Sequence, residues 1–394
     1  MTLLKKLCIG TTIAAMMIGL VACGGSKSNT ESSDAGSKTS SETKKEKSDF
    51  SNLKIGALLT GSDEDTSGYS FAHVQGIKSA ARNLGINEDH IVWKNFISDT
   101  MDNSSDEQVK AAIEGCINDG CKLIFSTSYG YKNVTKSMAA KHPDVYFAHA
   151  TGDISNGTNF INYFGRVYQA RYLSGIAAGL KTKSNKVGFV SAWGIENSEC
   201  SSNINAFAMG VASVNPDAKV YVSTTDSWFD AKKEKAAAKS LLKKGCDVIA
   251  QHVDTAEPQI AAEEAGAFGI GYNSDMTKDA PDAVLTSVIW NWDVFYTWAM
   301  KAVGEKTWDG KNYLGGLNEG MVGVTKLTAL NHPDAEKLIQ DATDKMKSGD
   351  WDVFTGVIPT NKKTTVGSED SSLDDDDILF GTNWYYKNVV TLDK

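Results

Sequence analysis

The sequence Lys-Ile-Gly-Ala-Leu-Leu at residues 54–59 has a counterpart, Lys-Val-Gly-Phe-Val, at residues 186–190. Both are short apolar runs that begin at a lysine and have glycine in the third position. Runs that are apolar throughout are typical of strands buried on both faces of a parallel sheet. The recurrence indicates that one sheet-forming unit occurs twice in the chain.

Four more apolar runs follow each of these two in the same order. A Gly-Cys pair opens residues 120–125 and again residues 245–250, placed 66 and 59 residues after the first lysine of each half. The other three pairs are 91–93 with 219–222, 145–148 with 268–271, and 159–163 with 284–289. Helical patterns separate or follow the runs, at 71–84, 107–118, 168–180, 231–244, 293–303 and near 334–348. Strands that alternate with helices predict an α/β protein of two similar lobes, each a doubly wound parallel sheet.

Length and composition agree with this organisation. At roughly 100–200 residues per domain, 394 residues correspond to two domains. A chain that is 41% hydrophobic and 23% charged is not mostly disordered, and six prolines and 35 glycines exclude a collagen-like chain. The net charge of −9, without a long basic run, argues against a nucleic-acid partner.

The N-terminus has the pattern of a secretory signal. Two lysines, Lys5 and Lys6, precede an uncharged stretch at residues 7–22. The sequence Leu-Val-Ala-Cys-Gly at residues 20–24 resembles the lipobox of bacterial lipoproteins, whose cysteine becomes the acylated first residue. We therefore expect a signal peptide at 1–22 and lipidation at Cys23, although an ordinary signal peptide with an accidental cysteine stays open.

The stretch after Cys23 is predicted to be a flexible tether. Residues 24–49 contain one aliphatic side chain, Ala35, among glycine, polar and charged residues, and cannot bury enough apolar surface to order themselves. We place the acylated cysteine and tether at residues 23–52. After residue 25 no apolar run approaches the ~20 residues of a membrane span. The expected location is the extracytoplasmic face of the cell membrane, held by lipid.

Several stretches resemble the basic membrane protein family, the substrate-binding lipoproteins of ABC importers that include purine nucleoside receptors. These stretches are residues 164–175, 226–230, 251–254 and 271–275. The resemblance implies a type I periplasmic-binding-protein fold, in which two lobes joined by three crossovers close on a ligand. The crossovers are expected near Gly165, Trp290 and 321–326. The lobes are then 53–165 with about 291–322, and 166–290 with about 323–394.

The fold also implies where the ligand lies, because ligands of open α/β sheets bind beyond the carboxyl ends of the strands. Carboxylates, amides and aromatic rings follow these predicted ends. Aromatic faces suit a flat heterocycle, and the polar groups suit its nitrogens. The candidate ligand residues are Tyr69, Ser70, Phe71, His73, Ser128 and Tyr129 in the first lobe, and Trp193, Asn205, Trp228, Asp254, Asn273, Asp275 and Trp290 in the second.

Departures from the family pattern bear on the ligand. In the purine receptors an aromatic residue from each lobe clamps the base, and by position Tyr69 or Phe71 and Trp228 correspond to that pair. The family tract Asp-x-Ser-Phe-Asn reads Gly-Tyr-Ser-Phe-Ala at residues 68–72, and a lysine usual after the last second-lobe strand is Trp290. Hydrophilic groups are therefore lost, which favours a nucleobase such as adenine over a nucleoside, with both left open.

Other features have plainer interpretations. Aromatic residues at strand ends also occur in core and hinge packing, and Arg166 and Arg171 are expected to form ion pairs at the hinge. Six scattered histidines lack metal-ligand spacing, so neither a metal nor a cofactor is expected. The four cysteines of the body are expected as free thiols, with a disulfide between Cys116 and Cys121 left open.

Two function classes remain. No Gly-x-Ser-x-Gly motif or Walker-type phosphate loop is present, and no nucleophile–base pair emerges, so an enzyme is not expected. The first class is a monomeric solute-binding lipoprotein that serves an ABC permease and captures a purine nucleobase or nucleoside. The second is a surface sensor or regulator of the same fold without a transport role. A different small solute, such as a sugar, is a further alternative.

Overall fold

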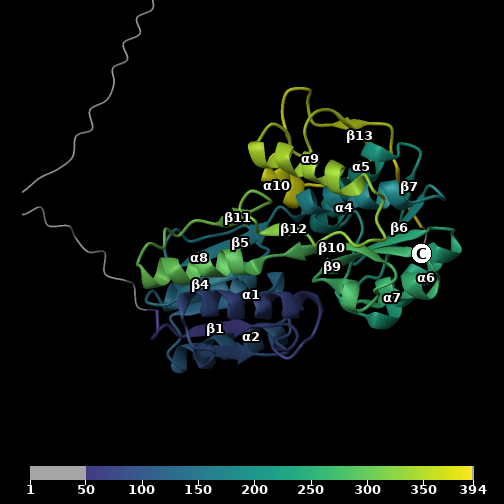
Figure 1. The fold of residues 1–394 in the computed structure, drawn as a ribbon. Coiled ribbons are helices and arrows are strands. Elements are labelled where there is room, and N and C mark those ends of the chain that lie inside the picture. The colour runs from purple at the N-terminus through teal and green to yellow at the C-terminus, as the bar shows by residue number, and fades with distance from the viewer. Residues whose placement is uncertain (1–49, 393–394) are drawn as a thin grey trace, which may run out of the picture. The chain divides into compact units, whose positions relative to one another are not determined.

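The structure, a computed structural model, describes residues 50–392, which form two β-sheets with helices on both faces of each (Figure 1). Cys23, the predicted signal peptide and most of the predicted tether lie outside these residues. Among residues 50–392, no helix is long and apolar enough to cross a membrane.

The first sheet is entirely parallel, with strand order β11-β5-β4-β3-β1-β2. Its strands are β1 (Ile55–Leu58), β2 (Ile91–Lys94), β3 (Leu123–Ser126), β4 (Tyr146–Ala150), β5 (Phe160–Gly165) and β11 (Tyr313–Gly315). The helices of this lobe are α1 (Gly68–Leu84), α2 (Asn103–Asn118), α3 (Lys132–Lys141) and α8 (Trp292–Gly304), with short 3-10 turns η1 (Glu88–His90) and η2 (Tyr129–Tyr131).

The second sheet has the order β12-β10-β9-β8-β6-β7-β15, and only β12 runs antiparallel to its neighbour. Its strands are β6 (Lys186–Ser191), β7 (Lys219–Thr224), β8 (Val248–His252), β9 (Phe268–Asn273), β10 (Val284–Trp290), β12 (Val322–Val324) and β15 (Val389–Thr391). The helices are α4 (Val167–Lys181), α5 (Ser198–Val214), α6 (Ala231–Lys243), α7 (Glu257–Glu264), α9 (Ala335–Ser348) and α10 (Asp375–Leu379), with the turn η3 (Met276–Lys278) and a small hairpin of β13 (Ile358–Pro359) and β14 (Thr365–Val366).

The duplication predicted from the sequence is confirmed. Strands β2-β1-β3-β4-β5 and β7-β6-β8-β9-β10 stand in the same order, and all ten predicted runs form strands. The second sheet adds one edge strand, β15, which pairs in parallel with β7. The carboxyl ends of the two sets of equivalent strands therefore supply equivalent loops.

Alternate residues of each strand enter different core layers, as the pleat of a strand requires. Leu123 and Phe125 of β3 pack in the layer of α1 and α8, whereas Ile124 packs against α2 and α3. In β8, Val248 packs in the layer of α4 and α5, and Ile249 faces α6 and α7. Helices therefore cover both faces of each sheet, and doubly wound sheets are confirmed.

The chain passes between the sheets three times, as predicted. The passages are β5 to α4 at Gly165, β10 to α8 at Trp290, and β11 to β12 through residues 316–321. The third passage thus lies just before the expected residues 321–326. Backbone hydrogen bonds join the passages, from Arg166 N to the Gly315 oxygen at 2.7 Å and from Asn291 N to the Met321 oxygen at 2.8 Å.

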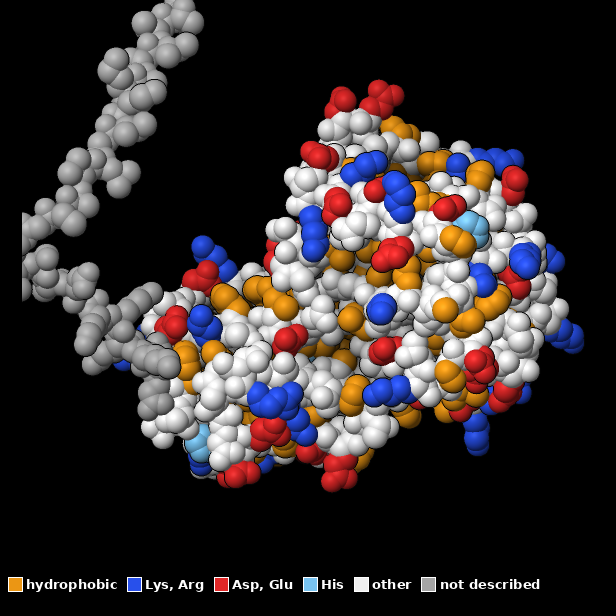
Figure 2. Space-filling model, viewed as in Figure 1, with side chains coloured by type: hydrophobic (Ala, Val, Ile, Leu, Met, Phe, Trp, Pro, Cys, Tyr) orange, Lys and Arg blue, Asp and Glu red, His pale blue; other side chains and the backbone are white. Residues whose placement is uncertain are grey.

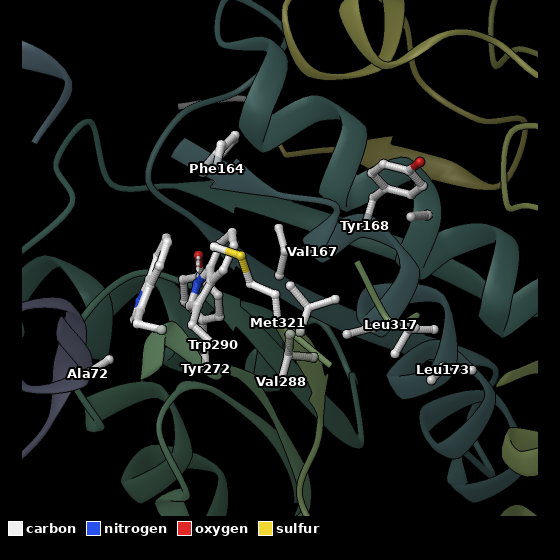
Figure 3. Close-up of a cluster of buried hydrophobic side chains, with 14 of the residues drawn as sticks. Ala72, Phe164, Val167, Tyr168, Leu173, Tyr272, Val288, Trp290, Leu317 and Met321 are labelled. Atoms are coloured by element: carbon white, nitrogen blue, oxygen red, sulfur yellow. Dashed lines mark hydrogen bonds between the residues drawn. The ribbon is translucent and has the colours of Figure 1, made fainter. Parts of the chain in front are cut away.

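One hydrophobic layer continues through these passages. Figure 3 shows Trp290 beside Tyr272 and Met321, with Phe164 on the other side of the indole. A Cβ added to Gly165 would lie 2.6 Å from the Trp290 ring, so glycine lets the first passage run against the second. The three passages between the sheets therefore pack against one another through buried apolar side chains.

The two arginines near the first passage behave differently. Arg166 forms a bidentate ion pair with Asp375 of α10, at 2.8 and 2.7 Å, and also donates to the Leu314 carbonyl of β11. Arg171 is fully buried and has no carboxylate within 4.0 Å among the described residues. The expectation of a hinge ion pair therefore holds for Arg166 and was wrong for Arg171.

Candidate functional site

The two lobes meet at the start of α1. Gly68 has a φ of +84°, and a Cβ built on it would lie 2.7 Å from the backbone oxygen of Asp254, which follows β8. Glycine is therefore required here both by its backbone conformation and by the close approach of the other lobe. The carboxyl-end loops of the two sheets are in contact in this structure.

A pocket of about 380 Å³ opens beside this contact, between α1 of the first lobe and the ends of β9 and β10 of the second. This volume falls in the range of about 300–1,000 Å³ typical of small-molecule sites. Four predicted residues line it, namely Phe71, Asn273, Asp275 and Trp290. Figure 2 shows hydrophobic side chains where the lobes meet, with charged side chains scattered over the rest of this face.

Stacked aromatic rings form one side of the pocket. The Trp290 ring stacks on Trp292 at 4.6 Å and on Phe164 at 5.5 Å between centroids. Its Nε1–H donates to the Tyr272 hydroxyl at 3.2 Å, and the indole is 6% exposed. Trp290 therefore serves hinge packing and lines the pocket at the same time.

On α1 the pocket is lined by Phe71, Gln75 and Arg82 among others, whereas Tyr69 and His73 belong to a neighbouring group of rings outside this lining. Tyr69 donates its hydroxyl to the Thr127 carbonyl at 2.7 Å and lies edge-on to His73 at 4.4 Å. His73 is fully buried, stacks on Trp292 at 4.3 Å and is 2.6 Å from the Tyr296 hydroxyl through Nδ1. Burial lowers the pKa of His73 to about 3, so its imidazole is uncharged at neutral pH.

In the second lobe, Trp228 and Asp254 lie outside the lining of this pocket, close to the contact with Gly68. The Trp228 ring lies 5.7 Å from the buried His252, which stacks on Tyr272 at 4.5 Å. The Trp228 carbonyl accepts from Asp254 N at 3.0 Å, and the Asp254 carboxyl accepts from Asn273 Nδ2 at 2.8 Å. Hydrogen bonds therefore connect Trp228 to Asp254, and Asp254 to Asn273.

Two carboxyl groups on this side have raised pKa values. Burial, together with the charges of Glu234, Glu199 and Asp99, raises the pKa of Asp254 to about 8, although the hydrogen bond from Asn273 opposes this shift. Burial also raises the pKa of Glu199 to about 7, against the attraction of Arg171. Buried acids with raised pKa values are candidates for a functional role.

Five predicted residues, Ser70, Ser128, Tyr129, Trp193 and Asn205, lie outside the pocket lining and make other contacts. Ser70 accepts from Gly61 N and holds the loop after β1, Ser128 donates to Asp99 at 2.6 Å, and Tyr129 is exposed beneath the Lys132 ammonium. Trp193 is partly buried against the core of its own lobe.

Asn205 is fully buried and ties α5 to the C-terminal segment. Its amide donates to the Trp384 carbonyl at 2.8 Å and its oxygen accepts from Tyr386 N at 2.7 Å. Because backbone groups satisfy both ends of the side chain, we do not retain Asn205 as a ligand contact.

Sequence reasoning missed Glu199, Tyr272 and Trp292. Tyr272 stands within strand β9, and Trp292, two residues after β10, opens helix α8, where its ring was interpreted as helix packing at the hinge. Glu199 lies in the first turn of α5, which Asn197 caps by accepting from Cys200 N. An Asn-x-Glu sequence after a strand is the one signal that could have placed Glu199 there.

The cysteines and the metal-ligating side chains of the described residues bear on two of the sequence expectations. Cys116, Cys121, Cys200 and Cys246 are all buried and free. Within residues 50–392, no group of three or more His, Cys, Asp and Glu side chains is arranged to hold a metal ion.

Comparison with known proteins supplies the remaining findings. Residues 53–352 match the Bmp family, described as ABC transporter substrate-binding protein PnrA-like. The chain is 36% identical over 341 residues to a purine-binding protein of Brucella abortus, covering 86% of this chain and 93% of that protein. It is also 34% identical over 234 residues to a putative ABC transporter glucose-binding protein, TsgA13, of Haloferax volcanii, covering 59% of each.

Solved structures agree on the fold. A solute-binding protein of Aeropyrum pernix superimposes with a TM-score of 0.64 at 18% identity, covering 76% of this chain and 92% of that chain. A transcriptional activator of the comK gene from Bacillus halodurans gives the same TM-score at 21% identity, covering 76% and 99%. The predicted type I periplasmic-binding-protein fold is thereby confirmed.

Proposed function

Because this chain belongs to the PnrA-like family of ABC transporter substrate-binding proteins, we propose that it captures a purine-type ligand, a nucleobase or a nucleoside, between its lobes. The observation that carries this proposal is the pocket to which the first lobe contributes Phe71 and the second contributes Trp290. Apolar ring faces from both lobes suit a planar heterocycle. The purine-binding relative from Brucella abortus supports the same ligand class.

Capture is coupled to movement about the hinge. The three passages between the sheets allow the lobes to close, and closure presents a shape that a permease can distinguish from the open form. Gly68 and Asp254 touch only when the lobes are together. Members of this family work with an ABC permease, and we propose that the closed monomer is the form that engages it.

We further propose that the protein is anchored through lipid at Cys23 on the extracytoplasmic face, with the following residues as a tether. The lipobox-like sequence at residues 20–24 supports this anchor. Membrane fractionation of cells that express wild type or Cys23→Ala tests it. The wild type should sediment with membranes and the variant should not; equal sedimentation would refute the anchor.

The ligand is tested by purifying the protein, denaturing it and identifying the released small molecules by mass spectrometry. A purine base or nucleoside is expected, and isothermal titration with the same compound should then show one site per chain. A sugar in the extract would overturn the purine proposal. Sugar is the second candidate because the partial relative TsgA13 is named as a putative glucose-binding protein.

A sensor without a transport role would use the same ligand and a different partner. The genes that flank this one distinguish the two roles, since an importer needs an ATPase and permeases. A neighbouring histidine kinase would favour the sensor.

A further inference from the structure

Glu234, in the first turn of α6, is a fully buried acid that joins two loops of the second lobe. Its Oε1 accepts from Asp230 N at 3.0 Å, in the loop after β7. Its Oε2 accepts from Thr255 N at 3.1 Å and from the Thr255 hydroxyl at 2.6 Å, in the loop after β8. The side chain therefore bridges residues 225–230 and residues 253–256.

The three groups that contact the Glu234 carboxyl group are all donors. The Thr255 hydroxyl accepts from Glu257 N at 3.3 Å, so its own proton is directed to Glu234. Burial raises the pKa of Glu234, and the hydrogen bonds from Thr255 and Asp230 oppose the rise. An acid fits this position because both of its oxygens can accept, one for each loop.

The two loops carry the groups that the second lobe brings to the contact between the lobes. The first loop contains Trp228 and the second contains Asp254, and Asp254 N donates to the Trp228 carbonyl at 3.0 Å. The backbone oxygen of Asp254 is the atom that a Cβ on Gly68 would approach to 2.7 Å. A shift of either loop would therefore change how the lobes meet.

The loop after β7 has a backbone conformation that needs support. Asp226 has a φ of +52°, in the left-handed region that non-glycine residues rarely adopt. Such a conformation persists only where the surroundings fix it. Within the loop, the Thr225 hydroxyl donates to the Ser227 carbonyl at 2.7 Å. Glu234 adds a restraint from outside the loop, at Asp230.

The first lobe joins its equivalent loops in a similar way. The Ser128 hydroxyl, after β3, donates to the Asp99 carboxylate, after β2, at 2.6 Å. The Tyr131 hydroxyl donates to the Ile97 carbonyl at 2.6 Å and joins the same two segments. A carboxylate therefore connects the loops after equivalent strands in both lobes. It comes from a loop in the first lobe and from a helix in the second.

We propose that Glu234 is a positioning residue for ligand capture, which holds the Trp228 and Asp254 loops at the spacing at which they meet the first lobe and does not contact the ligand itself. This inference rests on the proposed function, because the affinity that Glu234 affects is that of the same cleft. Loops that are fixed before binding lose less conformational freedom when the ligand arrives, which strengthens binding.

Glu234→Gln tests the bridge, because the side chain keeps its shape while one of its two acceptors becomes a donor. Whichever way the amide turns, the backbone N–H of Asp230 or of Thr255 loses its acceptor. Isothermal titration with adenine and adenosine measures affinity, and the compound that the wild type binds more tightly is the probe. Its affinity should fall about 5- to 20-fold. Hydrogen exchange of the ligand-free protein, read by mass spectrometry, should become faster in both 225–230 and 253–256. A merely structural acid would lower Tm and change neither readout.

Two further variants complete the test. Thr255→Val removes the hydroxyl that donates to Glu234 and keeps Thr255 N, so affinity should fall by a smaller factor, about 2- to 4-fold. This variant also serves if Glu234→Gln does not fold. Glu264→Gln is the matched control, because Glu264 is exposed on α7 and pairs with Lys235 of α6 at 2.9 Å. Its affinity and its exchange in the two segments should equal those of the wild type.

Unchanged affinity, or unchanged exchange of the two segments, in both Glu234→Gln and Thr255→Val would overturn the positioning role while the purine proposal stands. If the wild type binds neither adenine nor adenosine, the proposed function fails. The exchange of residues 225–230 and 253–256 then decides by itself whether Glu234 holds the two loops.

Discussion

The two lobes have the same strand order, but they supply different chemistry to the cleft. The first lobe contributes neutral rings that hold one another, with Tyr69 against His73 and His73 on Trp292. The second contributes the carboxyl groups of Asp254 and Glu199. The equivalent sheets therefore share a framework while their loops differ, and we propose that the first lobe offers ring surfaces to the ligand and the second offers hydrogen-bonding groups.

The largest expected effect comes from keeping the two walls apart. Gly68→Ala places a methyl group against the Asp254 oxygen, so closure is obstructed and ligand affinity should fall about 100-fold or more. Isothermal titration measures the affinity, and small-angle scattering with ligand measures closure. Gly85→Ala is the control, since Gly85 also has a positive φ of +71° at the other end of α1 but nothing lies within 4 Å of its Cβ. Gly85→Ala should lower stability and leave affinity unchanged; equal affinity losses in both variants would contradict the obstruction.

A smaller effect is expected when one wall loses its ring. Trp228→Ala removes a partly buried ring of the second lobe, and the lost stacking and apolar contact should weaken binding by about 2 kcal/mol, roughly 30-fold. Tyr69→Phe keeps the ring of the first lobe and removes only the hydroxyl that binds the Thr127 carbonyl. It should change affinity by less than about 3-fold, as titration can verify. If Tyr69→Phe lost more ligand affinity than Trp228→Ala, the proposal that the ring of Trp228 contacts the ligand would be contradicted.

The acidic wall should make stability depend on pH. Because the folded-state pKa values of Asp254 and Glu199 are raised to about 8 and about 7, the folded state holds protons that the unfolded chain has released. Stability therefore falls as pH rises and levels off above about pH 8. Between pH 6.5 and 8.5 the loss should be about 1–2 kcal/mol.

The buried histidines have the opposite effect on the pH dependence of stability, and they have it at lower pH. The pKa values of His73 and His149 are lowered to about 3 and about 4, and that of His252 is also lowered, so they favour the folded state as pH rises only up to about 6.5. Denaturant unfolding of the ligand-free protein between pH 6.5 and 8.5 therefore measures mainly the contribution of Asp254 and Glu199 to the pH dependence of stability. Asp254→Asn should flatten the profile, and an unaltered slope in this variant would exclude Asp254 as its source.

The smallest effect is expected at the hinge. Arg166 joins the Leu314 carbonyl of the first lobe to Asp375 of the second, and both charged side chains are partly exposed. Arg166→Lys loses the bidentate geometry and should cost about 1 kcal/mol or less, a fall in Tm of about 2 °C by calorimetry. Lys122→Ala, which breaks an exposed pair with Asp144 in one lobe, should cost less. If Arg166→Lys lowers the free energy of unfolding no more than Lys122→Ala does, the ion pair does not hold the lobes together and packing does.

The framework was predictable because buried parallel strands contain runs of apolar residues, and Leu123–Phe125 of β3 and Val248–Ala250 of β8 are such runs. Helix α5 was not predicted individually. Eleven of its residues are buried, so its sequence lacks the single apolar face that indicates a helix.

The site was predictable only where a residue directly follows a strand. This rule found Trp228 and Asp254, which lie together after β7 and β8. It could not reveal that Asn205 is satisfied by Trp384 and Tyr386, because those partners lie about 180 positions away along the chain. It also could not reveal that Glu199 lies 3.4 Å from Nε2 of the buried His252, which belongs to another element.

Both sheets contain an edge strand that comes late in the chain, and this affects how the protein folds. Strand β11 pairs with β5, and β15, near the end of the chain, pairs with β7. Each sheet is therefore completed only by a segment made long after its neighbour, and neither lobe consists of one continuous stretch. Such pairings between distant residues slow folding. A chain that stops before β15 would leave the β7 edge of the second sheet without its pairing partner.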